Sequence, residues 1–394
     1  MNLDRRGFLA ASLAGGLLYS LEGCGGGGSA PAPKPTIELK LLAGGNPEPA
    51  TLFAPSAPEP LDGTGAEAQF YFAQAPIVDP SGNIYLIDGN AIRKVSATGV
   101  VTTLAGDVLD SGYVDAVGTA ARFFIPLALA FDPNGNILVS EATNLVRCIS
   151  PTGVVSTLIG STTASLGGQT QTVAGTLATL SPGYQSPLVV DRNGNILIAP
   201  YGSVIKIITP AGAISTLAGN TSTANNDGVG TAASFGLGIA AMAMDSTGDI
   251  FLTQYQAPAL NVFGNPYTPG GAIVRKIGTG AVVTTVAGGT NGAPNAWGYV
   301  NGPAASAEFT QLSGIAIDSA GDLYLADELN LTVRKITISS GNVSSVVGNG
   351  YVANPKTVLG PLPAELGVLT GVAVSGSRLI VTTETGILYT TALP

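Results

Sequence analysis

One short pattern recurs five times along this chain and limits the folds open to it. Each copy has Asp, two variable residues, Gly and then Asn or Asp, followed by a run of strand-forming residues. The copies are DPSGNIYL, DPNGNILV, DRNGNILI, DSTGDIFL and DSAGDLYL, which begin at Asp79, Asp132, Asp191, Asp245 and Asp318 and are therefore 53, 59, 54 and 73 residues apart. Repeats of this length that are built from strands are typical of β-propeller blades.

Each repeat unit predicts the same four strands. In the second unit these are residues 126–131, 136–141, 145–150 and 153–160. The third strand recurs as AIRKV, LVRCI, VIKII, IVRKI and TVRKI, and the fourth as VVTTLAG, VVSTLIG, AISTLAG, VVTTVAG and NVSSVVG. A looser signal joins the units, as in DGTGAEAQF at residues 62–70. The pattern therefore predicts an all-β protein made of short antiparallel sheets.

The copy DPNGNILVSE, at residues 132–141, raises the question of a calcium loop, because Asp and Asn alternate and Glu141 closes the run. An EF-hand loop needs Gly at its sixth position and an acid at its twelfth. Here Gly135 is fourth and Glu141 is tenth. The order Asp, Pro, x, Gly instead predicts a type I turn continued by a bulge, with Asp132 capping the turn.

Together these motifs resemble the NHL repeat in its bacterial form, in which a strand-turn-strand unit ends in R-K-I and T-T-L-A-G. The segment D-G-x-G-x-x-A-x-F joins neighbouring blades in that family. The resemblance covers about residues 37–394 and implies a β-propeller. It departs at the family's histidine, where this chain has Leu145 and Leu331.

The two ends of the repeat region complement each other. The segment LTGVAVSGSRLIVTTETGILYTT, at residues 369–391, supplies three strands and lacks the fourth. The segment TIELKLLAGG, at residues 36–45, matches a fourth strand. We therefore expect a six-bladed β-propeller whose ring is closed by the N-terminal strand completing the last blade, which protects the sheet edges. The alternative is five blades with a separate terminal domain.

The first residues have the layout of an export signal. Arg5 and Arg6 are followed by an apolar stretch that is too short to span a bilayer comfortably. The run RRGFL resembles a twin-arginine signal, and LEGC resembles a lipobox, in which Cys24 is lipidated. The alternative is ordinary cleavage, which releases a soluble secreted protein.

We accordingly divide the chain into a signal peptide (1–23), a Gly/Pro-rich linker (24–36) and an NHL propeller (37–394). The linker GGGGSAPAPKP has nothing to pack and suits a tether. The two signatures predict an exported protein of the bacterial cell envelope. Its lipid anchor would hold it at the outer membrane or at the periplasmic side of the inner membrane.

Composition excludes several classes of function. The chain has no histidine, which rules out Ser-His-Asp and Cys-His catalysis and any His-ligated metal site. The net charge of −9 argues against nucleic acid as a partner, because phosphate binding needs clustered Lys and Arg. Cys148 lies in an apolar strand pattern, where we expect a buried and inert thiol.

The long insertions all fall on one face of the predicted ring. Turns between first and second strands and between third and fourth strands are short, whereas second-to-third loops and connections between blades are long and varied. Loops held by a rigid frame commonly carry function. Aromatic residues gather in these segments, and they form our candidate binding face: Tyr113, Tyr255, Phe263, Tyr267, Trp297 and Tyr299. Their alternative role is to pack the loops against the rim.

Acids end several second strands on the same face, namely Asp88, Glu141 and Asp327. Carboxylate oxygens of this kind could hold Ca²⁺, so these three residues are the candidate metal ligands. The alternative is pairing with arginines of the adjacent third strands, Arg93, Arg147 and Arg334.

From these features we expect a non-catalytic scaffold that binds a protein, a small molecule or a glycan on its variable face, without a required cofactor. Six-bladed relatives in the wider propeller group include calcium-dependent lactonases, so a calcium-dependent hydrolase is the enzymatic alternative. A purely structural envelope protein is the third hypothesis. The lyases of this group that use histidine are excluded by composition.

Overall fold

The computed structural model describes residues 36–44, 59–142, 145–166, 169–175, 187–200, 202–236, 238–255, 271–289, 298–350 and 356–394. All of these residues belong to one compact unit, residues 36–394. The predicted export signal with Arg5 and Arg6 and the predicted lipidation site Cys24 lie outside the described residues. None of the helices in the described part of the chain has the length and apolar character that a membrane span requires.

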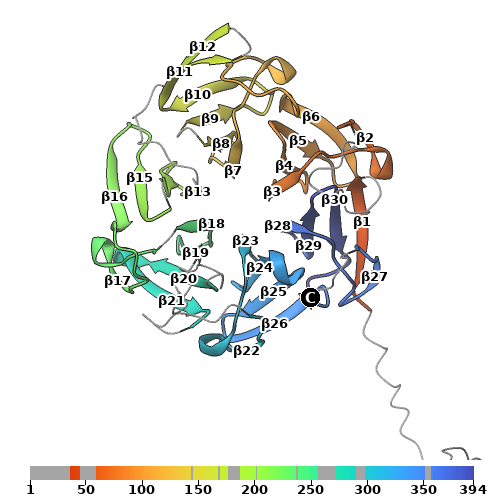
Figure 1. The fold of residues 1–394 in the computed structure, drawn as a ribbon, viewed down its shortest axis with the longest axis vertical. Coiled ribbons are helices and arrows are strands. Elements are labelled where there is room, and N and C mark those ends of the chain that lie inside the picture. The colour runs from red at the N-terminus through yellow and green to blue at the C-terminus, as the bar shows by residue number, and fades with distance from the viewer. Residues whose placement is uncertain are drawn as a thin grey trace, which may run out of the picture. The chain divides into compact units, whose positions relative to one another are not determined.

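Six antiparallel sheets form the blades of a propeller, and Figure 1 shows them side by side around a ring. Blade 1 runs outward from β3 (Ala73–Val78) through β4 (Ile84–Asp88), β5 (Ala91–Val95) and β6 (Val100–Gly106) to the short β2 (Gly63–Thr64). Blade 2 contains β7 (Pro126–Phe131), β8 (Ile137–Glu141), β9 (Val146–Ile149) and β10 (Val155–Ile159). Blade 3 contains β13 (Leu188–Val190), β14 (Ile196–Ile198), β15 (Val204–Ile208) and β16 (Ile214–Gly219).

Blades 4, 5 and 6, like blade 1, each have a fifth, outer strand. Blade 4 contains β18 (Ile239–Met244), β19 (Ile250–Tyr255), β20 (Ala272–Gly278), β21 (Val282–Ala287) and β17 (Gly228–Val229). Blade 5 contains β23 (Leu312–Ile317), β24 (Leu323–Asp327), β25 (Thr332–Thr337), β26 (Asn342–Val347) and β22 (Gly302–Pro303). Blade 6 contains β28 (Leu369–Ser375), β29 (Arg378–Thr383), β30 (Gly386–Thr390), β1 (Glu38–Gly44) and β27 (Gly360–Pro361).

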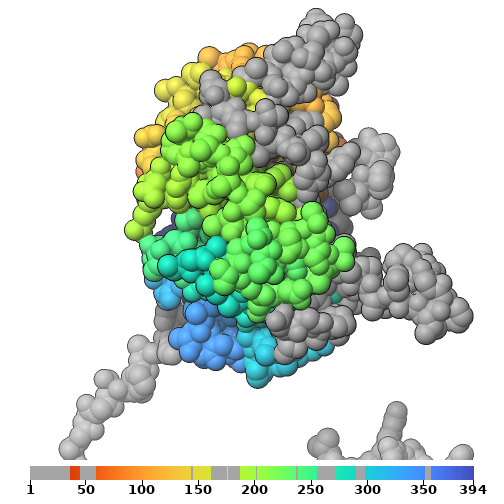
Figure 2. Space-filling view, turned by 90° about the vertical axis from the view of Figure 1, so that its left-hand side faces the viewer, coloured from red at the N-terminus to blue at the C-terminus, as the bar shows by residue number. Residues whose placement is uncertain are grey.

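The remaining elements are short. A two-stranded hairpin, β11 (Ser161–Leu166) and β12 (Gln169–Ala174), follows blade 2. The 3₁₀ turns are η1 (Gly65–Glu67), η2 (Gly118–Ala120), η3 (Gly230–Ala232), η4 (Thr279–Ala281), η5 (Ala304–Ser306) and η6 (Glu328–Asn330). Figure 2 looks onto the rim where blades 3 and 4, coloured green to cyan, lie next to each other.

The N-terminal strand closes the ring, as the sequence predicts. Strand β1 pairs antiparallel with β30, so the first described strand is the fourth strand of the last blade. The backbone N–H of Thr391 donates to the carbonyl of Glu38 (2.9 Å), and the N–H of Glu38 donates to Thr391 Oγ1 (3.0 Å). Leu39 and Ala43 of this strand are fully buried. Pairing of the two ends leaves β30 without an open edge.

The recurrent motif is a turn, which confirms that part of the sequence analysis. Asp132 Oδ1 accepts the backbone N–H groups of Asn134 and Asn136, both at 2.8 Å, and its Oδ2 accepts Asn136 Nδ2 at 2.7 Å. Gly135 has a φ of +80°, which only glycine adopts readily. Asp132 therefore caps the hairpin between β7 and β8.

Strand register gives each blade two distinct edges. In blade 1 the pairs at one edge are Val78 with Ile84 and Val95 with Val101, beside the Asp79 turn. The pairs at the opposite edge are Ala73 with Asp88 and Ala91 with Gly106. We call the first side of the ring the turn face. We call the second the connection face, because the second-to-third loops and the connections between blades begin and end there.

Candidate binding face

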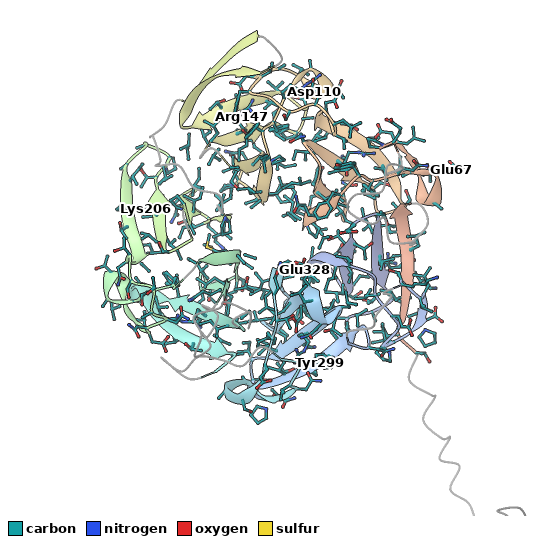
Figure 3. All side chains as sticks on the ribbon, in the orientation of Figure 1. Glu67, Asp110, Arg147, Lys206, Tyr299 and Glu328 are labelled. Atoms are coloured by element: carbon teal, nitrogen blue, oxygen red, sulfur yellow. The ribbon has the colours of Figure 1, made fainter. Side chains whose placement is uncertain are left out.

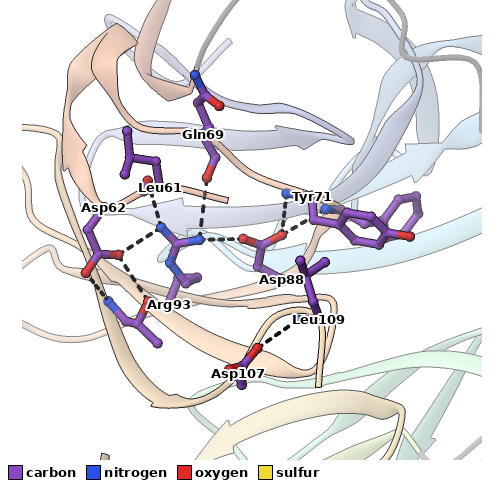
Figure 4. Close-up of polar contacts among 10 residues, drawn as sticks. Leu61, Asp62, Gln69, Tyr71, Asp88, Arg93, Asp107 and Leu109 are labelled. Atoms are coloured by element: carbon purple, nitrogen blue, oxygen red, sulfur yellow. Dashed lines mark hydrogen bonds and ion pairs between the residues drawn. The ribbon is translucent and has the colours of Figure 1, made fainter. Parts of the chain in front are cut away.

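A buried arginine of blade 1 forms hydrogen bonds to the segment that connects β1 to this blade, as Figure 4 shows. Arg93 is fully buried, and its Nη1 donates to Asp88 Oδ2 at 2.6 Å. Its Nη2 donates to Asp62 Oδ1 at 2.9 Å and to the carbonyl of Leu61 at 3.0 Å. Asp88 comes from the second strand, whereas Leu61 and Asp62 come from the connecting segment. The guanidinium therefore joins the sheet to the chain that enters it.

The same arrangement recurs in blades 2, 4 and 5. The equivalent guanidinium groups are fully buried and belong to Arg147, Arg275 and Arg334. Arg147 pairs with Glu141 and Asp115, Arg275 with Asp227, and Arg334 with Asp327. In all four blades the guanidinium carbon lies 4.9–5.7 Å from the ring centre of a buried phenylalanine in the connecting segment. We call each such set an arginine cluster.

Blade 6 lacks the cluster, and every member is replaced together. The register places Leu388 where Arg93 stands in blade 1 and Leu41 opposite it, where blade 1 has Thr103. The pairing of β27 with β1 puts Leu359 at the position of Asp62, and Leu366 and Thr383 take the places of Phe70 and Asp88. A mostly apolar set thus replaces the charged set found elsewhere, with Leu366 and Leu388 buried and Leu359 46 % exposed.

Blade 3 departs in a different way. Lys206 pairs with Ile198 and so stands where the other blades have arginine, and Pro200 follows the second strand in place of an acid. Lys206 Nζ donates to Thr216 Oγ1 at 2.7 Å, and Figure 3 shows Lys206 within blade 3. The described residues supply no fifth strand to this blade.

The three candidate metal ligands do not come together. Asp88, Glu141 and Asp327 are fully buried in three different blades, and each lies 2.6–3.0 Å from the arginine of its own cluster. Within the described ranges no group of three or more Asp, Glu or Cys side chains could hold a metal ion. Each of these acids therefore pairs with the arginine of the adjacent third strand, which was the alternative to calcium binding, and the three do not form a shared calcium site.

Burial changes the titration of two of these acids. It raises the pKa of Asp88 despite the opposing effect of Arg93 and the backbone N–H groups of Tyr71 and Phe72. It raises the pKa of Glu141 to about 8, again against the attraction of Arg147. Glu141 Oε2 has no hydrogen-bond partner among the described residues. A carboxylate that is desolvated and only half satisfied holds its proton more tightly.

Two of the predicted aromatic residues have described side chains. Tyr113 is buried and stacks on Phe124, with ring centres 5.2 Å apart, so it packs the connection instead of facing solvent. Tyr299 is 40 % exposed and lies 4.9 Å beneath the guanidinium of Arg334 (Figure 3). The side chain of Tyr255, and Phe263, Tyr267 and Trp297 altogether, lie outside the described part of the structure.

Sequence reasoning missed three exposed apolar side chains on the connection face. Tyr71, Leu109 and Ile125 are each about half exposed. Asn90 links two of their segments, because its N–H donates to the carbonyl of Val108 (3.0 Å) and its Oδ1 accepts the N–H of Ile125 (3.3 Å). The signal available in the sequence was the pair of large apolar residues directly before a first strand, as in Tyr71-Phe72.

The centre of the ring is lined mostly by apolar side chains. A cavity of about 120 Å³ is lined by first-strand residues of all six blades, among them Pro76, Leu127, Leu188, Met242, Ile315 and Val372. Glu328 directly follows β24 and so lies at the connection-face end of blade 5, where it accepts a hydrogen bond from Gln311 Nε2 at 2.9 Å; Figure 3 labels it near the middle of the ring. Burial, and then the nearby charge of Glu384, raise the pKa of Glu328.

Comparison with known proteins shows the fold. No family model and no curated protein matches the chain. Among solved structures, an auxiliary nutrient binding protein from Bacteroides thetaiotaomicron is similar, with 12 % identity over 91 % of this chain and 77 % of that one, at a TM-score of 0.59. A protein of the same description from Bacteroides ovatus has 14 % identity over 90 % and 76 %, at a TM-score of 0.57. A putative phosphatase from B. thetaiotaomicron has 12 % identity over 90 % and 78 %, at 0.56.

Proposed function

We propose that this chain is an NHL-type β-propeller that acts as a non-catalytic binding scaffold and takes its ligand on the connection face. One observation carries the proposal. On that face the strand-end acids Asp88, Glu141 and Asp327 are fully buried beside arginines, while Tyr71, Leu109 and Ile125 are exposed to solvent. A surface whose acids are buried and whose apolar side chains are exposed suits recognition better than acid–base chemistry.

The ligand class follows from the same surface. Exposed aromatic and aliphatic side chains suit a protein, a small molecule or a glycan, all of which present apolar area or stacking faces. The name auxiliary nutrient binding protein, printed for two solved structures of the same fold, supports a binding role. The name putative phosphatase, printed for another, belongs to that protein alone.

The envelope location of the scaffold rests on the sequence. A lipid on Cys24 would place residues 25–35 as a tether between the membrane and the propeller. Cells that express the chain should incorporate labelled fatty acid into it, and Cys24→Ala should abolish the label and release the protein from the membrane fraction. Equal labelling of both chains would remove the anchor from the proposal.

Recovery of partners from envelope extracts tests the binding role. Residues 256–270 are replaced by a Gly/Ser linker of the same length, and separate chains carry Trp297→Ala or Leu109→Ser. Val154→Ser is the matched control, because Val154 is comparably exposed but lies on the turn face. The proposal predicts that the connection-face changes reduce recovery and the control does not. Unchanged recovery with all three connection-face variants would refute the proposal.

A further inference from the structure

One cross-strand pair distinguishes the blades at the turn face. In blades 1, 4 and 5 an aromatic residue of the second strand stands opposite a lysine of the third, as the pairs Tyr85–Lys94, Phe251–Lys276 and Tyr324–Lys335. Each lysine Nζ lies 5.2–5.5 Å from the ring centre. Tyr85 also packs edge-on against Phe131 of blade 2, at 5.6 Å. These aromatic side chains fill space beside the turns.

Blades 2 and 3 have smaller residues at these positions. Their pairs are Leu138–Cys148 and Leu197–Ile207. A cavity of about 530 Å³ lies between blades 2 and 3, with Leu138 and Cys148 in its lining. A second cavity of about 330 Å³ lies between blades 3 and 4 and is lined by Leu197. Both grooves therefore border a blade with these smaller side chains, and the larger lies between the two such blades and has the size of a small-molecule site.

Polar groups rim the larger groove, but only some are free to bind. The carboxylate of Asp132, in the lining of the larger groove, accepts N–H groups of its own turn. Asp191 accepts the equivalent N–H groups in the next blade, but it lines the smaller cavity. Arg192 lines both cavities and is exposed, and it makes no hydrogen bond or ion pair within the described part of the chain. The other four turns have an uncharged residue at this position, namely Pro80, Pro133, Ser246 and Ser319.

We propose that the groove between blades 2 and 3 binds a small carboxylic acid with an apolar tail. The tail would lie against Leu138 and Cys148, and the carboxylate would accept hydrogen bonds from Arg192, whose planar donors match two carboxylate oxygens. A phosphate or another multiply charged anion fits less well, because the lining of this groove offers a single cation, Arg192, together with the carboxylate of Asp132. This site lies on the opposite face from the proposed scaffold surface, so an experiment that refutes one of the two proposals leaves the other intact.

Titration calorimetry with octanoate on the full chain tests the site, with octan-1-ol and octylammonium as matched probes. We expect octanoate to bind, octan-1-ol to bind at least about tenfold more weakly, as loss of a charge-assisted hydrogen bond implies, and octylammonium not to bind. Absence of octanoate binding, or equal binding of octan-1-ol or octylammonium, would overturn the proposal.

Variants locate the binding site. Arg192→Gln should weaken octanoate binding about tenfold or more, whereas Arg378→Gln, an equal loss of charge on the turn face of blade 6, should leave it unchanged. Leu138→Tyr should abolish binding by filling the groove, since Tyr85 and Tyr324 donate to the equivalent aspartates. Leu197→Tyr fills only the smaller groove and should leave binding intact. An effect of Arg378→Gln equal to that of Arg192→Gln would overturn the assignment.

A thiol reaction supplies a second readout that does not depend on calorimetry. In a chain carrying Cys24→Ser, Cys148 is the remaining cysteine. The sequence predicts a buried thiol, but Cys148 is only partly buried in the structure and lines the groove. Bound octanoate should therefore slow its reaction with a maleimide, and octylammonium at the same concentration should not. An octanoate-independent rate in a chain that binds octanoate would place the ligand elsewhere and contradict the proposal.

Discussion

Arg93 stabilises blade 1 only as long as its partners stay in place. A buried guanidinium has lost its hydration, and the acceptors Asp62, Asp88 and Leu61 replace that water. The cluster fixes the position of the connecting segment on the sheet, because the acceptors come from two parts of the chain and the guanidinium holds them in a single geometry. At the scale of single residues, the buried charges on the connection face therefore have a structural role.

The pH dependence of stability should report the proton on Glu141. The pKa of this carboxyl is about 8 in the fold, compared with an ordinary value of 4.5. The folded chain therefore keeps a proton that the unfolded chain releases between these values, so this contribution to stability is present below pH 4.5 and is lost as the pH rises through 8. The free energy of unfolding of the natural chain, measured with denaturant, should therefore fall over this pH range relative to that of Glu141→Gln.

The Glu141→Gln chain is a fair reference because blade 4 already has Gln254 at this position. Gln254 Oε1 accepts a hydrogen bond from Arg275 at 3.2 Å. If Arg147 held Glu141 ionised throughout, the difference between the two chains would stay constant from about pH 5 to about pH 9, which would contradict the prediction.

The turn glycine should be sensitive to substitution for a conformational reason alone. A Cβ on Gly135 would meet no atom within 4 Å, but the residue has a φ of +80°. We expect Gly135→Ala to lower the free energy of unfolding by about 1–2 kcal/mol. Asn134→Ala, in the same exposed turn, is the control and should change it by less than about 0.5 kcal/mol. Equal effects on thermal unfolding would mean that the φ is not the cause.

Single-residue roles were predictable from sequence where they depend on local spacing. The cap formed by Asp132 follows from the separation between Asp, Gly and Asn within one turn. The burial of Tyr113 and the exposure of Leu109 do not follow from any local pattern, because each depends on packing between segments that the ring brings together.

A blade as an element can be built with a charged or an apolar filling. Blades 1, 2, 4 and 5 use arginine clusters, and blade 6 uses Leu41, Leu359, Leu366, Leu388 and Thr383. The replacement of all members together implies that the cluster acts as one structural unit. A buried ion pair and a well-packed apolar set can be of similar stability, whereas half of a pair is unstable.

Transfer of the blade 6 set into blade 1 tests this interpretation. Arg93→Leu alone should lower the free energy of unfolding by about 3–5 kcal/mol, because it leaves Asp88 buried without its partner. The fivefold variant Arg93→Leu, Thr103→Leu, Asp62→Leu, Phe70→Leu and Asp88→Thr should recover most of that loss in denaturant unfolding. A fivefold variant less stable than Arg93→Leu would show that the clusters do not act as units.

Strand-level features were the easier part to predict. The period of the repeat fixes which runs become strands and which turns join them, so the four-strand blades follow from the sequence. The mostly apolar set of blade 6 could not be predicted from the repeat pattern. Its members come from residues 38–44, 359–366 and 383–388, which become neighbours only when β1 joins β30.

At the scale of the whole molecule, ring closure makes the first strand essential. A chain that begins at residue 46 lacks β1 and leaves β30 with an unpaired edge, whereas a chain that begins at residue 36 keeps it. The loss should exceed about 3 kcal/mol, since burial of one leucine contributes about 1.5–3 kcal/mol and Leu39 is one of several buried residues in β1. Thermal unfolding and gel filtration should show a less stable, self-associating chain. Equal stability of the two chains would contradict closure by β1.

The ring also gives the molecule two chemically different faces. The turn face has short, capped turns and the two grooves beside blade 3. The connection face has exposed apolar residues, and the described strands place the ends of the second-to-third loops and of the connections between blades there. The position of the insertions on that face follows from strand alternation and was predictable from sequence. The identity of the exposed residues around Asn90 needed the three-dimensional structure.

Site-specific photo-crosslinking in the cell envelope tests the assignment of binding to the connection face most directly. A benzophenone amino acid is placed at Leu109, which is 56 % exposed on the connection face, or at Val154, which is 46 % exposed on the turn face. The scaffold function predicts a discrete protein or glycan adduct from position 109 and none from position 154. An adduct from position 154 alone, or adducts of equal yield from both positions, would contradict it.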